Sequence, residues 1–106
     1  MSKLYLEIKK EVEDLLAGLP DDPNTIANFM TDIECYGLPC RTNDCPIACY
    51  IKKSIPELDW YVSTVLIVGI MDGVNYNVFI KNVPFAIKQF IDAFDGYKYK
   101  ELICTS

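Results

Sequence analysis

Hydrophobic residues in the stretch 60–81 follow a pattern typical of a β-hairpin. Two arms rich in β-branched and aromatic residues, 60–71 and 74–81, flank Asp72-Gly73. An Asp-Gly pair favours a two-residue hairpin turn, which would pair Met71 with Val74. The side chains then expected on the core face are Val65, Ile67, Gly69, Met71, Val74, Tyr76, Val78 and Ile80.

The opposite face of this predicted hairpin also carries apolar side chains. Leu66, Val68 and Ile70 on the first arm share this face with Phe79 on the second. Apolar side chains in such a group need a cover, which a helix, the N-terminal segment or another chain could provide. An intramolecular helix is the favoured interpretation. A partner protein or a second copy of the chain, forming a homodimer, is the alternative.

An amphipathic pattern follows the hairpin and predicts a helix over 83–95. Asn82 is a suitable N-cap, Pro84 lies in the first turn, and Gly96 offers a left-handed stop. We expect this helix to pack on the core face of the hairpin. Its apolar stripe contains Val83, Ala86, Ile87, Phe90, Ile91 and Phe94.

Three further helical patterns precede the hairpin. The first begins near Ser2 and ends around Gly18, with a stripe of Leu4, Ile8, Val12, Leu15, Leu16 and Leu19. The second begins with Asp22 as its N-cap, followed by Pro23, and stops at Gly37. The third is short, with Asn43 or Asp44 as its expected N-cap and Pro46 near its start, and Pro56 prevents its continuation past Ile55.

Together these patterns predict an α+β fold with three N-terminal helices, one β-hairpin (about 60–71 and 74–81) and a C-terminal amphipathic helix (about 83–95) packed on it. A chain of 106 residues that is 51% hydrophobic suits a single domain over 1–106. No apolar stretch approaches the ~20 residues that span a bilayer, and no signal sequence begins the chain. We therefore expect a cytoplasmic protein with no membrane partner.

The formal net charge is −5. This acidity argues against direct nucleic-acid binding and favours a partner with a basic surface. Glu7, Glu11 and Asp14 lie on the polar side of the first predicted helix. Because lysines are interleaved among them, a solvated helix face is the favoured interpretation, and an acidic docking surface that imitates phosphates is the alternative.

Cys35, Cys40, Cys45 and Cys49 form the only constellation with candidate metal chemistry, at a spacing of C-x4-C-x4-C-x3-C. Four thiolates can hold zinc or an iron–sulfur cluster. The spacing departs from the usual patterns of such sites. We therefore favour small buried or loop thiols with no metal and no cofactor, and keep the thiolate metal site as the alternative. Cys45, at a helix N-terminus, is a candidate for a lowered pKa and some reactivity.

Enzymatic function is not expected. The chain has no histidine, which excludes the usual serine and cysteine triads and imidazole acid–base steps. It also lacks phosphate-binding glycine motifs. An enzyme would have to rely on carboxylates or on Cys45 alone, and this remains a second alternative.

Two stretches carry a resemblance. They are Cys-Pro-Ile-Ala-Cys-Tyr at 45–50 and Val-Pro-Phe-Ala-Ile-Lys-Gln-Phe-Ile-Asp-Ala-Phe-Asp at 83–95, with Tyr99 and Leu102 after it. They resemble a set of small actinobacterial and phage proteins that share Cys-Pro-Leu-Ala-x-Tyr-Leu and Leu-Pro-x-x-Val-x-x-Phe-Val-x-x-Phe-Asp. The set has no established activity, so the resemblance implies a phage or mobile-element context and transfers no functional residue. Of the clustered cysteines, only Cys45 clearly belongs to the shared pattern.

These observations lead to one functional prediction. We expect a small acidic, non-catalytic interaction module that binds a host protein and inhibits or modulates it, for example a host-defence inhibitor such as an anti-CRISPR protein. The predicted partner-binding residues are Glu7, Glu11, Asp14, Leu66, Val68, Ile70 and Phe79.

Overall fold

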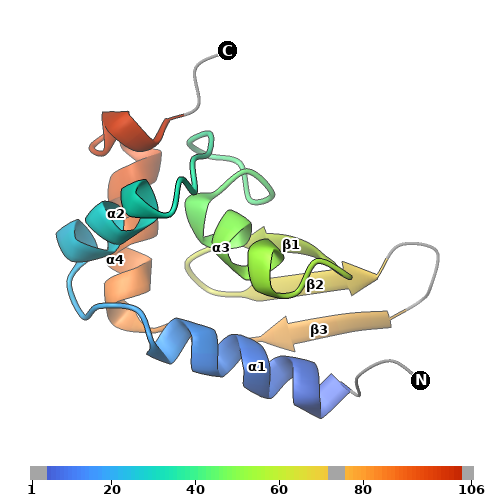
Figure 1. Ribbon diagram of the computed structural model, residues 1–106. Coiled ribbons are helices and arrows are strands. Elements are labelled where there is room, and N and C mark those ends of the chain that lie inside the picture. The colour runs from blue at the N-terminus through green and yellow to red at the C-terminus, as the bar shows by residue number, and fades with distance from the viewer. Residues whose placement is uncertain (1–4, 72–75, 104–106) are drawn as a thin grey trace.

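The computed structural model describes residues 5–71 and 76–103 of the chain. These residues form four α-helices, one three-stranded antiparallel sheet and a short 3-10 helix (Figure 1). Three helices precede the sheet and one follows it. The α+β class predicted from the sequence is confirmed, whereas the predicted single hairpin is replaced by a three-stranded sheet.

Helix α1 (Tyr5–Ala17) follows its predicted stripe. Three side chains on its inward face are buried, namely Ile8, Val12 and Leu16. Leu19, just beyond the end of the helix, is buried as well. The expected cap Ser2 and the stripe residue Leu4 lie outside the described residues. Helix α1 packs along the third strand, as Figure 1 shows.

Helix α2 (Pro23–Asp32) begins as its sequence predicts. The Asp22 carboxylate accepts a hydrogen bond from the Thr25 amide at 3.0 Å, and Pro23 occupies the first helical position. The helix ends earlier than the predicted stop at Gly37. Glu34 has a φ of 57°, a left-handed conformation in which an α-helix cannot continue.

Helix α3 (Pro46–Ser54) has Cys45 at its N-cap position, where the sequence predicted Asn43 or Asp44, and Ile55 is its C-cap, just before Pro56. Its end is attached to the sheet by Trp60, whose indole Nε1 donates a hydrogen bond to the Ile55 carbonyl oxygen at 3.0 Å. Helix α3 packs against the first strand, so the short connection at 55–58 places the helix over one side of the sheet.

The predicted strand 60–71 is in fact two strands, β1 (Asp59–Val62) and β2 (Ile67–Met71). Between them the chain reverses. Ser63 donates its amide to the Leu66 carbonyl oxygen at 3.0 Å, and its hydroxyl accepts the Leu66 amide at 3.1 Å. Val65, expected in the core, lies in this turn and is 71% exposed. A serine side chain that bonds its own turn explains a reversal without glycine or proline.

Strand β3 (Tyr76–Ile80) pairs with β2 in a register shifted by two residues from the prediction. Ile67 lies opposite Ile80, and Met71 lies opposite Tyr76. Four residues, 72–75, therefore connect the strands instead of two, and the Asp72-Gly73 pair falls outside the described residues. A shift of two preserves the alternation of faces, so Ile67, Val78 and Ile80 are buried as predicted.

Helix α4 (Phe85–Asp95) begins after Pro84 as N-cap and not at Asn82. Its stripe of Ile87, Phe90, Ile91 and Phe94 is buried as predicted and belongs to the same core as the sheet. The helix that packs against it most extensively is α2, behind which it lies in Figure 1. The prediction that this helix packs mainly on the hairpin is therefore wrong for the described residues, because its extensive contacts are with α2 and not with a strand.

The tail forms a short 3-10 helix (Lys100–Leu102). Tyr99 stacks on Phe90 with ring centroids 5.4 Å apart, and its hydroxyl hydrogen-bonds Asn24 at 2.8 Å. Gly37 donates its amide to the Leu102 carbonyl oxygen at 2.9 Å. The described tail is therefore anchored on α2 and α4.

Candidate protein-binding surface

The outer face of the sheet brings together side chains from all three strands. The register places Tyr61 opposite Val68, and Val68 opposite Phe79, in one row across the sheet. The same pairing forms a neighbouring row of Asp59, Ile70 and Asn77. Cross-strand neighbours on one face lie close enough to contact one another. The sheet thus presents an apolar strip, which we call the outer strip: Tyr61, Leu66, Val68, Ile70 and Phe79.

The outer strip is partly open to solvent. Ile70 is 37% exposed and Phe79 is 39% exposed, whereas Leu66, Val68 and Tyr61 are half-buried. The favoured interpretation, that a helix covers this face, is wrong for the part of the chain that the structure describes. The four predicted residues Leu66, Val68, Ile70 and Phe79 do lie on one face, as expected from their spacing.

Tyr61 is a member of this surface that the sequence pattern did not reveal. In a continuous strand over 60–71, Tyr61 would share a face with Val65 and Ile67 and would point inward. The turn at 63–66 reverses the chain, so Trp60 and Val62 are buried and Tyr61 is half-buried on the other side. Only knowledge of the turn could have placed Tyr61 outside.

The predicted acidic residues lie on another part of the molecule. Glu7, Glu11 and Asp14 recur at four and three residues and so line one flank of α1. Asp14 also pairs with Lys10 at 3.4 Å. The residues of α1 that line a hollow together with Phe79 are instead Lys9 and Glu13. The two predicted contact regions are therefore separate surfaces.

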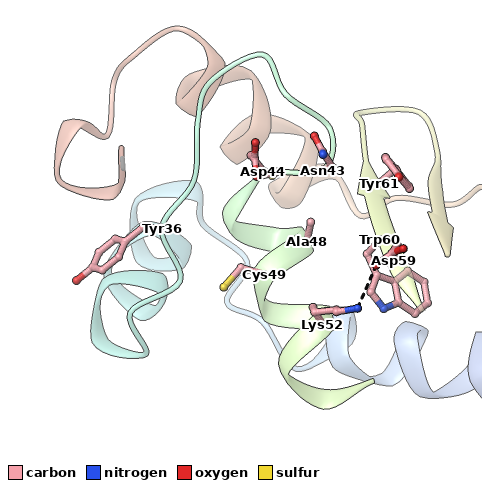
Figure 2. Close-up of a pocket in the computed structure, with 10 residues that line it drawn as sticks. Tyr36, Asn43, Asp44, Ala48, Cys49, Lys52, Asp59, Trp60 and Tyr61 are labelled. Atoms are coloured by element: carbon pink, nitrogen blue, oxygen red, sulfur yellow. Dashed lines mark hydrogen bonds and ion pairs between the residues drawn. The ribbon is translucent and has the colours of Figure 1, made fainter. Parts of the chain in front are cut away.

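A pocket of about 540 Å³ lies between α3, strand β1 and the loop before α3 (Figure 2). Lys52 reaches across it and bonds the Leu58 carbonyl oxygen at 2.9 Å and the Asp59 carboxylate at 3.2 Å, the contact dashed in Figure 2. Asp44 and Tyr61 line the same pocket. Because Tyr61 also belongs to the outer strip, the pocket and the strip adjoin. These residues come from separate segments, and no local motif could have connected them.

The four clustered cysteines are divided between several places. Cys35 is buried just after the end of α2, and Cys49 is half-buried on α3. Cys45 is buried at the N-cap of α3. Cys40 is exposed in the loop, where its amide donates to the Asp95 carboxylate at 2.9 Å. Over residues 5–71 and 76–103, no three cysteine or acidic residues lie close enough together to hold a metal, so the alternative four-thiolate site is not assembled.

The predicted reactivity of Cys45 is also wrong. Burial raises the pKa of its thiol from 9.0 to about 12, although the Ile47 and Ala48 amides, which hydrogen-bond it, act in the opposite direction. The loss of hydration outweighs the favourable helix N-terminus. Cys45 is a packed, protonated thiol at neutral pH and not an activated nucleophile.

Comparisons with protein-family models, curated proteins and solved structures found no match to this chain. The resemblance to the actinobacterial and phage set therefore rests on its two sequence motifs. Among the helices of the described residues, none is both long enough and apolar enough to cross a membrane.

Proposed function

We propose that this protein is a small non-catalytic module that binds another protein through the outer strip and inhibits or modulates it. The observation that supports the proposal is the row of Tyr61, Val68 and Phe79 across three strands, with Ile70 beside it, left partly exposed. Apolar and aromatic side chains gathered on one exposed face are typical of binding sites. A sheet holds them in a fixed arrangement, which lowers the entropy lost on binding.

Charge indicates the kind of partner. The chain carries a net charge of −5, and Asp59 lies at the edge of the outer strip with Asp44 in the adjoining pocket. A partner that places an apolar patch on the strip and lysine or arginine side chains around it would match both features. Complementary charge of this kind accelerates association and selects among partners.

In this proposal the protein is encoded by a phage or another mobile element and acts in the cytoplasm on a host protein. Its support is the motif resemblance, the small size and the acidity. The concrete version to test is inhibition of a host-defence protein, with an anti-CRISPR protein as the example. The alternative is that a second copy of this chain binds the same strip and forms a homodimer. Sedimentation of the pure protein distinguishes the two cases, because a homodimer forms without any host protein.

The decisive experiment compares two matched substitutions. Ile70→Lys places a cation in the middle of the outer strip, whereas Val65→Lys makes the same kind of change in the exposed turn. Tagged full-length variants are used as bait in lysates of candidate hosts, and each captured protein is then measured against the pure variants by titration. We expect Ile70→Lys to weaken binding at least about tenfold, as for an interface position that costs more than 1 kcal/mol, and Val65→Lys to leave it unchanged. Equal binding by both variants would contradict the proposal.

The acidic flank of α1 provides the competing contact region. Reversal of Glu7, Glu11 and Asp14 to lysine tests whether acidic side chains imitate a nucleic-acid backbone toward a basic host groove. A charge-matched control reverses Asp32, Glu34 and Glu101, which are exposed on other elements. If only the α1 variant loses binding while Ile70→Lys retains it, the contact surface is the flank and not the outer strip.

A further inference from the structure

A hollow of about 590 Å³ lies where one flank of α1 meets the end of β3. Helix α1 packs alongside this strand, as Figure 1 shows. The helix contributes Lys9 and Glu13, which are one helical turn apart, and the strand and the residues after it contribute Phe79, Lys81 and Asn82. We call this site the basic hollow. Its volume lies within the roughly 300–1,000 Å³ that is typical of small-molecule pockets.

The basic hollow carries a surplus of positive charge in a protein whose net charge is −5. Two ammonium groups and one carboxylate line it. Within the two described ranges, neither Lys9 nor Lys81 forms an ion pair, whereas Lys10 and Lys52 each pair with an aspartate. Two ammonium groups that line one hollow without a carboxylate partner attract an anion, and lysine is a common ligand of phosphate.

The other three lining residues supply an aromatic ring and hydrogen-bonding groups. Phe79 is 39% exposed, so part of its ring is accessible to a ligand. Nucleobases stack on rings of this kind. The amide of Asn82 and the carboxylate of Glu13 are groups that hydrogen-bond the edges of bases. Each of the lining side chains therefore has a counterpart in one nucleotide: phosphate for the lysines, the base plane for the ring, and the base edge for the amide and the carboxylate.

We propose that the basic hollow binds a nucleoside monophosphate, with the phosphate on Lys9 and Lys81 and the base on Phe79. The overall charge favours a single nucleotide over a nucleic acid. A polyanion meets the repulsion of a net charge of −5 along its length, whereas one phosphate interacts mainly with the charges nearest to it. The inference does not depend on the proposed function, since neither lysine belongs to the outer strip.

The test titrates the ¹⁵N-labelled full-length protein at low ionic strength and follows its amide chemical shifts. The probes are AMP, CMP, GMP and UMP, the four matching nucleosides, and inorganic phosphate. We expect at least one nucleotide to bind about tenfold or more tightly than its nucleoside and than phosphate, because it engages the ring and the lysines together. The shifts should concentrate at Lys9, Phe79 and Lys81. No saturable binding of any nucleotide up to about 10 mM, or binding no tighter than that of phosphate, would overturn the proposal.

Matched lysine substitutions test the position of the phosphate. Lys9→Gln and Lys81→Gln should each weaken binding of the tightest nucleotide about tenfold, as expected for the loss of one charged hydrogen bond. Lys88→Gln and Lys100→Gln remove the same charge from α4 and from the 3-10 helix, and they should leave binding unchanged. Equal losses in all four variants would show that net charge alone attracts the nucleotide, and this would overturn the assigned site.

A substitution of the ring tests the position of the base. Phe79→Leu keeps an apolar side chain and removes the aromatic surface, so it should reduce the advantage of the nucleotide over inorganic phosphate while phosphate binding stays the same. An unchanged advantage in a variant that circular dichroism shows to be folded would contradict stacking on Phe79. The outer strip is tested separately by Ile70→Lys, so either proposal can fail while the other stands.

Discussion

Trp60 and Gly69 lie opposite each other on β1 and β2, and the indole occupies the space that a β-carbon at position 69 would need. Such a β-carbon would come within 2.5 Å of Cζ3 of Trp60 and 2.9 Å of a Leu58 methyl carbon. Trp60 is only 3% exposed and is held by its hydrogen bond to Ile55. A glycine in the middle of a strand is therefore required by close packing and not by backbone conformation.

The first prediction concerns this contact. Gly69→Ala should lower the free energy of unfolding by about 1–3 kcal/mol, because the indole has no free space to enter. Gly18→Ala is the matched control. A β-carbon at position 18 would lie 3.6 Å from its nearest neighbours, which is ordinary contact, so the change should stay within about 0.5 kcal/mol of neutral or stabilise slightly. Urea denaturation measures both, and equal stability of the two variants would show that the sheet relaxes around the indole.

The second prediction concerns the start of α2. The Asp22 carboxylate accepts hydrogen bonds from the amide and the hydroxyl of Thr25 at 3.0 and 3.1 Å. Asp22→Ala should therefore lower the free energy of unfolding by about 1 kcal/mol. Asp21→Ala removes the same charge one residue earlier, outside the cap position, and should cost less than about 0.5 kcal/mol. A thermal melt that fails to separate these variants would argue against a contribution from the cap.

The third prediction concerns the end of α4, where the left-handed residue is not the glycine. Gly96 has a φ of −86°, and Tyr97 has a φ of 65°. The Tyr97→Gly variant should have a free energy of unfolding about 1 kcal/mol higher than that of Tyr97→Ala, because only glycine adopts this conformation without strain. At position 96, alanine should be as stable as glycine or more stable, because the backbone conformation there suits alanine. Denaturant midpoints of Tyr97→Gly, Tyr97→Ala and Gly96→Ala test the order, and alanine equal to glycine at 97 would contradict it.

The fourth prediction concerns alkaline pH. Burial raises the pKa of Cys45 from 9.0 to about 12, so the folded state favours the protonated thiol. The contribution of this raised pKa to the free energy of unfolding is fully present below pH 9 and is lost as the pH rises toward 12. The loss is at most about 1.4 kcal/mol per pH unit for one thiol. Cys45→Ala should therefore flatten the decline in unfolding free energy between pH 9 and 12.

The control for this pH dependence is Ile91→Val, which also removes buried volume but carries no titrating group. It should lower stability by a similar amount at every pH and leave the alkaline slope unchanged. Unfolding free energies from urea titrations at pH 7, 9, 10 and 11 provide the comparison. A slope in Cys45→Ala equal to that of the wild type would show that the thiol does not contribute.

Local chemistry made part of this fold predictable. Asp22 and Pro23 begin α2, and the period of apolar residues defines the buried stripes of α1 and α4, because caps and helical spacing act within a few residues. The alternation in 67–71 and 76–80 also predicts which side chains are buried. The two-residue error in register left those faces unchanged.

The sequence by itself therefore determined the α+β class, the helix stripes and the grouping of Leu66, Val68, Ile70 and Phe79 on one face. Only the tertiary structure decided that 60–71 divides at Ser63 into two strands, because the local Ser63 bonds compete with a continuous strand, and the pairing of β1 with β2 and the bond from the Val62 amide to the distant Thr42 carbonyl oxygen at 2.8 Å accompany the reversal. It also decided that Tyr61 joins the outer strip and that Cys45 is buried. These outcomes depend on contacts between segments far apart in the chain, and local periodicity contains no information about such contacts.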